Sequence, residues 1–280
     1  MRKIDELRFG TAGIPISTEE PADTAKGIRQ VRKLGLDVME LEFVRNINVS
    51  AEKAPLIKKT SQEEDILLTC HGQYFVNLAS LEKAKAEATI KRMLDAARRA
   101  HECGVWSIAW HAAFFQGRPK EKVYEIVKKN MGHVVKTLHN KGIKDIWIRT
   151  ETTGKESQWG DLPECIRLAQ DIEGVLPCVD FAHLHARNGI NNTTVEFRRM
   201  LEDIEKGLGK EALHNMHIHM SGVNYGPKGE RNHLILKASD MNYRDLLKVW
   251  KEFKIKGIVI NESPNIEGDA LLMQKFYSSF

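Results

Sequence analysis

Cys178-Val-Asp-Phe-Ala-His-Leu-His185 is the stretch that decides the fold. An apolar run over 174–179 leads directly into Asp180, and His183 and His185 follow at once. A short apolar run of this kind is typical of a buried strand. Its carboxylate and imidazoles would then lie at the tip of that strand. If other strands of the chain end in the same way, their tips should meet at one site.

The same pattern recurs along the chain and alternates with helical spacing. Strands are predicted over 7–10, 37–41, 65–70, 105–110, 145–150, 175–179, 215–219 and 257–261. Helices are predicted over 20–34, 51–59, 80–102, 120–140, 162–173, 194–208 and 240–253, with a helix or tail over 269–280. Strands that alternate with helices indicate parallel βαβ units, and eight units predict an α/β fold, the (β/α)8 TIM barrel. No Gly-rich phosphate loop follows the first strand, which disfavours an open doubly wound sheet. We expect one domain spanning 1–280.

The composition fits a globular protein with a sizeable core, at 42% hydrophobic and 29% charged residues. The net charge of +4 permits a polyanionic partner without demanding one. The four cysteines are widely spaced and form no CxxC pair, which argues against a zinc ribbon or a redox motif. The sequence shows no signal peptide and no apolar run near the roughly 20 residues of a membrane span. We therefore expect a cytoplasmic protein without membrane association.

Side chains that bind metals stand just past one predicted strand after another. The active site of a (β/α)8 barrel lies at the carboxyl ends of its strands. The residues found at or near those ends are His71, His111, Glu151, Asp180, His217, His219 and Glu262. Taken singly, each is more often a structural histidine or a carboxylate that begins a helix than a ligand.

The convergence of three carboxylates on one barrel mouth favours a metal cluster, because they would repel one another without cations between them. Imidazole combined with carboxylate suits Zn, Mn or Fe rather than Mg or Ca. One metal needs only three or four protein ligands, so the surplus predicts two or three ions. Closely spaced metals are typical of phosphoester hydrolysis.

A polar segment that contains several glycines follows the seventh strand, over 221–232. One interpretation is a solvated surface loop. The other is a lid that supplies Glu230 and His233 to a metal and Lys228 or Arg231 to a phosphate. For the two basic residues both interpretations stay open.

Five short motifs together carry a resemblance to a known family. They are His71-Gly-Gln-Tyr-Phe-Val-Asn-Leu78, Glu151-Thr-Thr-Gly154, Asp180-Phe-Ala-His183, Met216-His217 and Asn261-Glu-Ser-Pro-Asn265. They are similar to the His-x-x-Tyr-x-x-Asn-Leu, Glu-Asn-x-x-Gly, Asp-x-x-His, Met-His and Glu-Thr-Pro motifs of endonuclease IV. That family comprises metal-dependent AP endonucleases on a xylose-isomerase-like (β/α)8 barrel, and the resemblance extends over essentially the whole chain.

The resemblance implies three zinc ions and hydrolysis of the phosphodiester 5′ to abasic sites in duplex DNA. The expected cofactor is therefore Zn2+, as two or three ions, with Mn2+ as the alternative. Glu151 would bridge two metals and, with Glu262, act as a catalytic carboxylate. The implied ligand sets are His71, His111 and Glu151; Glu151, Asp180, His217 and Glu262; and His183 with Glu230 and His233.

The resemblance also implies DNA contacts around the barrel mouth. Tyr74 matches an aromatic residue that contacts distorted DNA, and Arg45 is a candidate for probing the minor groove. Lys228 and Arg231 would bind phosphates. The expected form is a monomer.

Two departures from the family pattern put part of the site in doubt. The family's third metal draws on Asp-x-His, whereas this chain has Glu230-Arg-Asn-His233, with the histidine one place later. His219 is an additional imidazole on the same strand face as His217, so either could be the ligand.

Two other functions remain open from the sequence. A sugar isomerase or epimerase of the same barrel group would use Glu151 and Glu262 as an acid/base pair around one metal. The surplus histidines argue against it. A DNA- or metal-binding protein without catalytic geometry is the third alternative.

Overall fold

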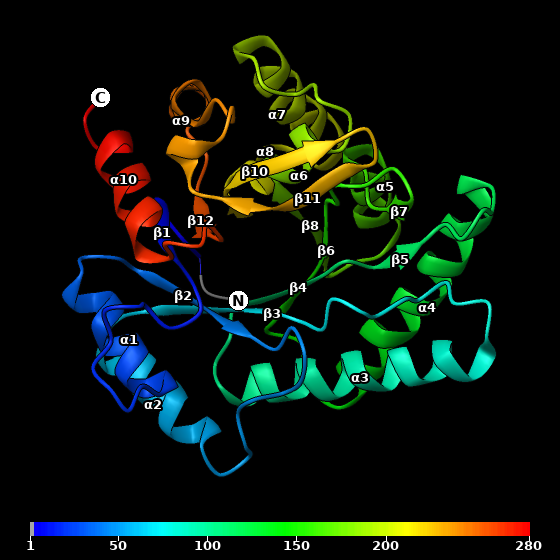
Figure 1. The fold of residues 1–280 in the computed structure, drawn as a ribbon. Helices are drawn as coiled ribbons and strands as arrows, with labels where there is room; N and C mark the ends of the chain where they lie inside the picture. Colours follow the sequence, from blue (N-terminus) through cyan, green and yellow to red (C-terminus); the bar gives the residue numbers. More distant parts are fainter. Residues whose placement is uncertain (1–2) are drawn as a thin grey trace.

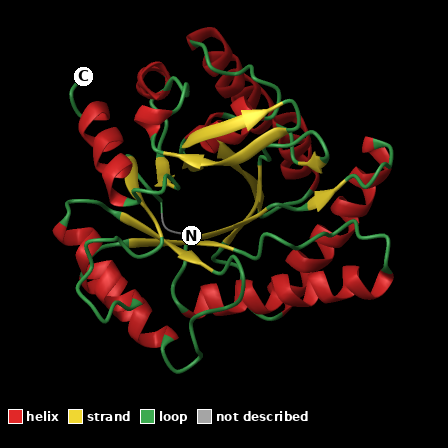
Figure 2. Ribbon diagram, viewed as in Figure 1, coloured by secondary structure: helices red, strands yellow, loops and turns green. Residues whose placement is uncertain are grey.

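Eight parallel strands close into a barrel in the computed structural model, which describes residues 3–280 (Figures 1 and 2). The strands are β1 Leu7–Ala12, β2 Val38–Glu42, β3 Leu67–His71, β4 Ser107–Trp110, β6 Trp147–Glu151, β8 Val175–Asp180, β9 Met216–Met220 and β12 Gly257–Asn261. They follow one another around the barrel in chain order, and β1 closes it by pairing with both β2 and β12. The predicted (β/α)8 fold is confirmed.

Helices form the outer layer around the strands (Figure 2). They are α1 Thr24–Lys33, α2 Ala54–Glu63, α3 Lys83–Glu102, α4 Lys120–Asn140, α5 Leu162–Asp171, α7 Thr194–Leu208, α8 Lys210–Leu213, α9 Tyr243–Glu252 and α10 Glu267–Tyr277. Eight of these match predicted helices, and several ends differ by a few residues. The short α8 was not predicted.

Capping side chains explain where several helices begin. Asp161 and Thr193 each form a capping box at the start of α5 and α7. Helix α9 begins later than predicted, after Asn242, whose side chain accepts a hydrogen bond from a backbone N–H of the first turn. Helix α3 likewise begins later than predicted, after Glu82.

The short helix α6, Phe181–Ala186, follows β8 without a loop and was not predicted. Asp180 ends the strand and caps this helix, because its Oδ1 accepts a hydrogen bond from the backbone N–H of His183 at 2.7 Å. The stretch from Cys178 to His185 is therefore the end of a strand, a cap and a helix of fewer than two turns. This arrangement brings Asp180 and His183 to the same end of the barrel.

The segment after β9 forms a β-hairpin instead of an irregular loop. Its strands are β10 Gly222–Gly226 and β11 Gly229–Leu234, which lie across the mouth of the barrel (Figure 1, yellow and orange). Gly229 permits the close approach of this hairpin to the barrel, since its φ is +88° and a Cβ there would lie 2.2 Å from the carbonyl oxygen of Gly154. A second short pair, β5 Ala113–Phe114 and β7 Gln158–Trp159, lies beside the mouth.

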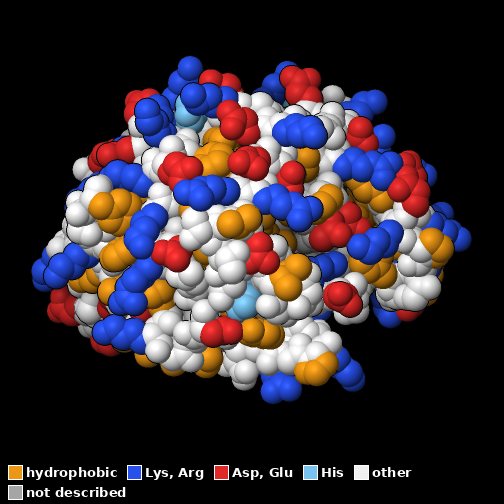
Figure 3. All heavy atoms as spheres, turned by 90° about the horizontal axis from the view of Figure 1, so that it is seen from above, with side chains coloured by type: hydrophobic (Ala, Val, Ile, Leu, Met, Phe, Trp, Pro, Cys, Tyr) orange, Lys and Arg blue, Asp and Glu red, His pale blue; other side chains and the backbone are white. Residues whose placement is uncertain are grey.

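Apolar side chains fill the space between barrel and helices, with Trp110, Trp159 and Trp250 fully buried. Cys70 and Cys178 are buried and free. Acidic and basic side chains are interspersed over the face shown in Figure 3. None of the helices within residues 3–280 has the length and apolar character that crossing a membrane requires.

Candidate metal centre

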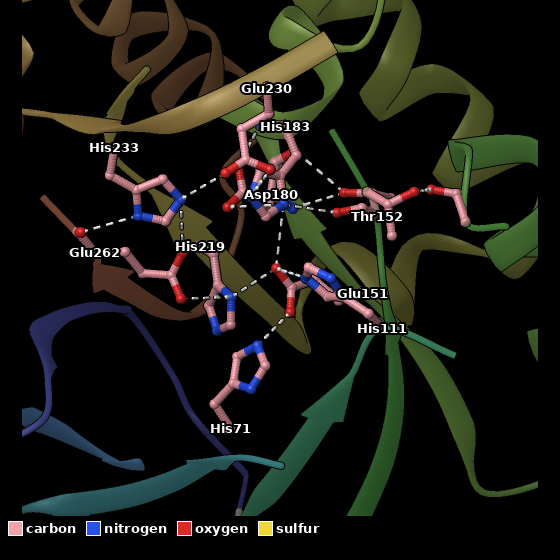
Figure 4. A network of polar contacts seen from close by, with 12 residues as sticks. His71, His111, Glu151, Thr152, Asp180, His183, His219, Glu230, His233 and Glu262 are labelled. Carbon is pink, nitrogen blue, oxygen red and sulfur yellow. Dashed lines mark hydrogen bonds and ion pairs between the residues drawn. The ribbon is translucent and has the colours of Figure 1, made fainter. Parts of the chain in front are cut away.

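The carboxyl ends of six barrel strands, helix α6 and the hairpin bring carboxylates and imidazoles together at the mouth (Figure 4). Glu151, at the end of β6, lies at the centre and is fully buried. Its carboxylate oxygens are 2.9 Å from Nε2 of His71 and 3.1 Å from Nε2 of His111. These three side chains form the first candidate ligand set.

The second ligand set consists of Glu151, Asp180, His219 and Glu262. Nδ1 of His219 lies 3.3 Å from Glu151 Oε1 and 3.4 Å from Glu262 Oε1. Glu151 is therefore shared by two sets, which is the bridging position expected for it. His71, His219 and Glu262 also lie within ligand range of one another, so the first two sets adjoin closely.

The third ligand set joins the barrel to the hairpin. Nε2 of His183 is 3.5 Å from Glu230 Oε2, and Nε2 of His233 is 3.8 Å from Glu230 Oε1. The sequence left this set in doubt because Glu230 replaces the family's Asp and the histidine stands one place later. Residues three apart also point to opposite faces of a regular strand.

A β-bulge removes that conflict. Asn224 pairs with Asn232 and Tyr225 with Glu230, so Arg231 is the extra residue in β11. A bulge of one residue restores the alternation beyond it. Glu230 and His233 therefore both face the barrel mouth, and the longer spacing leaves the ligand set intact.

His217 does not lie at the mouth, and the expected place for it is taken by His219. In the sheet register Asp180 pairs with His219, whereas Cys178 pairs with His217. Both histidines point into the barrel, but His217 lies one layer deeper, with Nδ1 3.0 Å from Ser107 Oγ and Nε2 3.1 Å from Glu40 Oε2. The assignment of His217 to the second ligand set is corrected accordingly.

Hydrogen bonds to backbone carbonyls orient three of the imidazoles. Nδ1 of His71 donates to Gly72 O, that of His183 to Thr152 O, and that of His233 to Glu262 O, at 2.6, 3.0 and 3.1 Å. A carbonyl can only accept, so the proton of each neutral ring lies on Nδ1 and the lone pair on Nε2. Each of these Nε2 atoms faces a carboxylate.

These residues fit divalent cations. A lone pair that faces a carboxylate is repulsive unless a proton or a cation lies between them. Buried ligand atoms without a hydrogen-bond partner gather here, namely both oxygens of Glu151, Asp180 Oδ2, His111 Nε2 and His219 Nδ1. Mixed imidazole and carboxylate donors suit Zn, Mn or Fe. The chemistry of the donor set therefore matches the metal cluster predicted from the sequence.

The pKa shifts reflect the same crowding of negative charge. Burial disfavours the charged form of His71, yet the Glu151 carboxylate outweighs burial and raises the pKa of His71 to about 10. The pKa of His183 is also raised, because Asp180 and Glu151 outweigh its burial. Burial raises the pKa of Glu262. In the absence of cations, protons on the imidazoles would balance the carboxylates.

Two carboxylates of β2 were missed as part of this site. Glu40 is fully buried beneath the centre, and Glu42 lines the cavity at its mouth. Burial and the nearby Glu40 raise the pKa of Glu42 to about 8. The available signal was the pair of glutamates two residues apart at the end of an otherwise apolar strand, which places both on one face.

The candidate DNA contacts lie around an open cavity of about 430 Å³ above the centre. Tyr74 lines this cavity and is 49% exposed, and Arg45 is exposed next to Val44, another lining residue. Lys228 and Arg231 are exposed on the hairpin and line a separate cavity, which shares Glu230 with the first. The basic pair is therefore adjacent to the metal centre and outside it.

The fold and the site define a (β/α)8 barrel with a carboxylate–histidine centre at its mouth. The chain belongs to the xylose isomerase-like TIM barrel family, whose model matches residues 28–276. Uncharacterized protein MJ0133 of Methanocaldococcus jannaschii is 41% identical over 273 residues, which cover 97% of each chain. The probable endonuclease 4 of Nitratidesulfovibrio vulgaris is 23% identical over 224 residues, 74% of this chain and 76% of that protein. The resemblance to endonuclease IV is thus confirmed at the level of distant sequence similarity.

Solved structures share the fold at low sequence identity. Endonuclease IV from Thermus thermophilus matches with a TM-score of 0.74 and 17% identity, over 96% of this chain and 100% of that one. A D-tagatose 3-epimerase-like protein matches with a TM-score of 0.71 and 17% identity, over 96% of each chain. At this level of identity the comparisons establish the barrel, and they do not separate nuclease from epimerase.

Proposed function

We propose that this protein is a metal-dependent phosphodiesterase that hydrolyses DNA 5′ to abasic sites. The observation that carries the proposal is the presence of three adjoining ligand sets, the third of which is supplied by His183, Glu230 and His233. Several relatives in sequence, including the one from Nitratidesulfovibrio vulgaris, bear the name probable endonuclease 4. A cluster of this size exceeds the needs of a single-metal enzyme.

Within this proposal the side chains have distinct roles. Bound cations would neutralise phosphate charge and increase the acidity of water. Glu151 is fully buried and contacts imidazoles of both neighbouring sets, so its role is to bridge them. The side chain of Glu262 is 12% exposed and faces the cavity, so it can take a proton from the attacking water.

The surroundings of the cavity suit a DNA substrate. Tyr74 offers an aromatic face at the rim, and Arg45, Lys228 and Arg231 offer exposed cations for phosphates. An abasic nucleotide can leave the stack at reduced cost, because no base has to be unstacked or unpaired. An open mouth with a deep centre is consistent with such an extruded sugar-phosphate.

Incision of a duplex that carries one tetrahydrofuran abasic site tests the proposal. We expect cleavage on the 5′ side of the site with Zn2+ or Mn2+, and none of the same duplex without the lesion. Glu262→Gln should lower the rate by roughly 100-fold or more, because it removes the proton acceptor. Absence of incision with Zn2+, Mn2+ and Mg2+ would contradict the proposal, and an unchanged rate in Glu262→Gln would exclude the assigned role.

A sugar epimerase is the second candidate, since Glu151, Asp180, His219 and Glu262 could by themselves hold one metal between two carboxylates. His71, His111 and His183 would then have no evident purpose. Elemental analysis of the purified protein separates the two functions. Two or three ions per chain favour the phosphodiesterase, and one ion favours the epimerase.

A further inference from the structure

Glu40 of β2 lies beneath the metal centre, fully buried between two imidazoles. Its Oε1 is 3.0 Å from Nε2 of His219, and its Oε2 is 3.1 Å from Nε2 of His217. A carboxylate at such depth is costly unless it is paired. The proposed chemistry at the mouth does not use it, so its position calls for a separate explanation.

His219 differs from the other imidazoles of the centre in the way it is oriented. His71, His183 and His233 turn Nδ1 to a backbone carbonyl and Nε2 to the site. His219 turns Nδ1 to the site, where it lies 3.3 Å from Glu151 Oε1, and Nε2 to Glu40. A neutral imidazole binds a cation only through the nitrogen that carries no proton.

We propose that Glu40 is a positioning residue of the metal centre: its carboxylate holds the proton of His219 on Nε2 and leaves Nδ1 for the cation bound with Glu151, Asp180 and Glu262. Glu40 thus does for His219 what a backbone carbonyl does for His71, His183 and His233. Replacing a carboxylate that orients a ligating histidine typically weakens metal binding by roughly 10–100-fold. The inference rests on the metal centre of the proposed function and is independent of the substrate.

A series of hydrogen bonds between buried polar groups orients His217, the imidazole on the other side of Glu40. Nε of Arg149 donates to Ser107 Oγ at 2.7 Å, and Ser107 Oγ is 3.0 Å from Nδ1 of His217. Because arginine can only donate, the serine hydroxyl accepts from it and has its own hydrogen available for Nδ1 of His217. His217 then carries its proton on Nε2, which faces Glu40.

Each oxygen of Glu40 therefore faces one imidazole Nε2, at 3.0 and 3.1 Å, and the two Nε2 atoms lie 3.2 Å from each other. The remaining donors of Arg149 bind backbone and side-chain oxygens of Pro177 and Asn215, so the guanidinium is held in place from below. His217, which the sequence suggested as a ligand, acquires a different role in this arrangement. It lies against Oε2 of Glu40 and so leaves Oε1 for His219.

Nitrogen-15 spectroscopy of the zinc-loaded full chain tests the inference directly. Long-range proton–nitrogen correlations distinguish protonated from metal-bound ring nitrogens, and His219→Asn identifies the signals of His219. We expect Nε2 of His219 to carry the proton and Nδ1 to bind zinc. A zinc-bound Nε2 would overturn the inference, because it would place the ion deeper, among Cys178, His217 and His219, which also lie within ligand range.

Glu40→Gln supplies the matching test of cause. The amide keeps the shape of the side chain but offers one acceptor and one donor where the carboxylate offers two acceptors. We expect zinc at this site to bind roughly 10–100-fold more weakly, with loss of the zinc-bound Nδ1 signal of His219 and partial recovery in Glu40→Asp. Unchanged zinc content and unchanged His219 signals in Glu40→Gln would overturn the inference.

A matched control and a second variant keep the result interpretable. Asp269→Asn makes the same change at another buried carboxylate, at the start of α10, and should leave the zinc content and the His219 signals unaltered. If Glu40→Gln does not fold, Ser107→Ala interrupts the same chain below His217 and should also weaken zinc binding. Zinc bound as expected without incision of DNA would reject the proposed function and retain the role of Glu40.

Discussion

Glu151 is the residue through which the ligand sets are connected. Its two oxygens lie within 3.3 Å of ring nitrogens from His71, His111, His183 and His219. Although four ring nitrogens lie this close, neither oxygen has a hydrogen-bond partner of suitable geometry. The charge state of these imidazoles must therefore depend on whether cations are bound.

The stability of the metal-free protein should fall as the pH rises. Glu151 outweighs burial and raises the pKa of His71 from 6.5 to about 10, so its proton stabilises the folded state fully below about pH 6.5, and that stabilisation is lost as the pH rises through about 10. Glu42, whose pKa is raised to about 8 by burial, acts in the same direction.

Thermal unfolding measured with a chelator and with Zn2+ tests this expectation. The melting temperature should decrease between about pH 6.5 and about pH 10 in chelator and change less with Zn2+, because cations replace the protons. His71→Gln should flatten the chelator curve. Equal slopes with and without Zn2+ would show that cations do not take over from these protons.

At the scale of elements, the hairpin β10–β11 is held to the barrel by a close contact of backbones. The N–H of Glu230 donates to Gly154 O at 2.9 Å, and Gly229 leaves no room for a side chain at this contact. The hairpin carries two ligands of the third set. Its docking and the formation of that set therefore depend on each other.

Gly229→Ala should displace the hairpin and weaken the third ligand set. The added methyl would meet the carbonyl of Gly154, and we expect about one metal ion fewer per chain. Gly142→Ala is the matched control, since Gly142 has a similar φ of +80° and open space around it. Both variants carry a backbone cost of roughly 1–2 kcal/mol, so a loss of metal confined to Gly229→Ala assigns the effect to the contact. Equal metal content in the two variants would contradict it.

The regular elements were predictable because their apolar periodicity is long and repeated. The eight barrel strands and the long helices α3 and α4 each carry that signal. Helix α6 has only six residues and depends on Asp180 as its cap, so no periodic pattern reveals it. The hairpin contains few apolar residues, and its bulge at Arg231 follows from pairing with β10.

The residues of the site were easier to predict than the depth at which each of them lies in the barrel. A strand pattern shows that His217 and His219 share a face, yet only the register with β8 shows which of them reaches the mouth. In the sequence, Glu40 and Glu42 have no metal-binding or charged partner that marks them as part of the site. Their role depends on spatial neighbours in β9 and β3, which are separate segments of the chain.

At the scale of the whole molecule, DNA binding would depend on a local surface, because the net charge is only +4 and the charges seen in Figure 3 are mixed. Lys228 and Arg231 are both exposed on the hairpin beside the cavity. Phosphate contacts made by such residues release counterions when DNA binds. The affinity for an abasic duplex should therefore fall as salt increases.

The double variant Lys228→Ala/Arg231→Ala should reduce the slope of log affinity against log salt by about two. Lys144→Ala, in the loop that enters β6 at the opposite end of the barrel, should leave the slope unchanged. Fluorescence anisotropy with a labelled abasic duplex measures both slopes. Each variant is combined with Glu262→Gln, so that the duplex is not cleaved during the measurement. If the double variant kept the original slope, the hairpin would not contact phosphates.

The third ligand set has a consequence for access to the active site. His183 belongs to α6 on the barrel, whereas Glu230 and His233 belong to the hairpin, so one cation there would cross-link two parts of the chain that are otherwise joined by the packing of Ala182 and Ala186 against Val223. Release of that ion would weaken the attachment of the hairpin to the barrel. The availability of metal in the surroundings would then regulate how readily a substrate enters, as well as how fast it reacts.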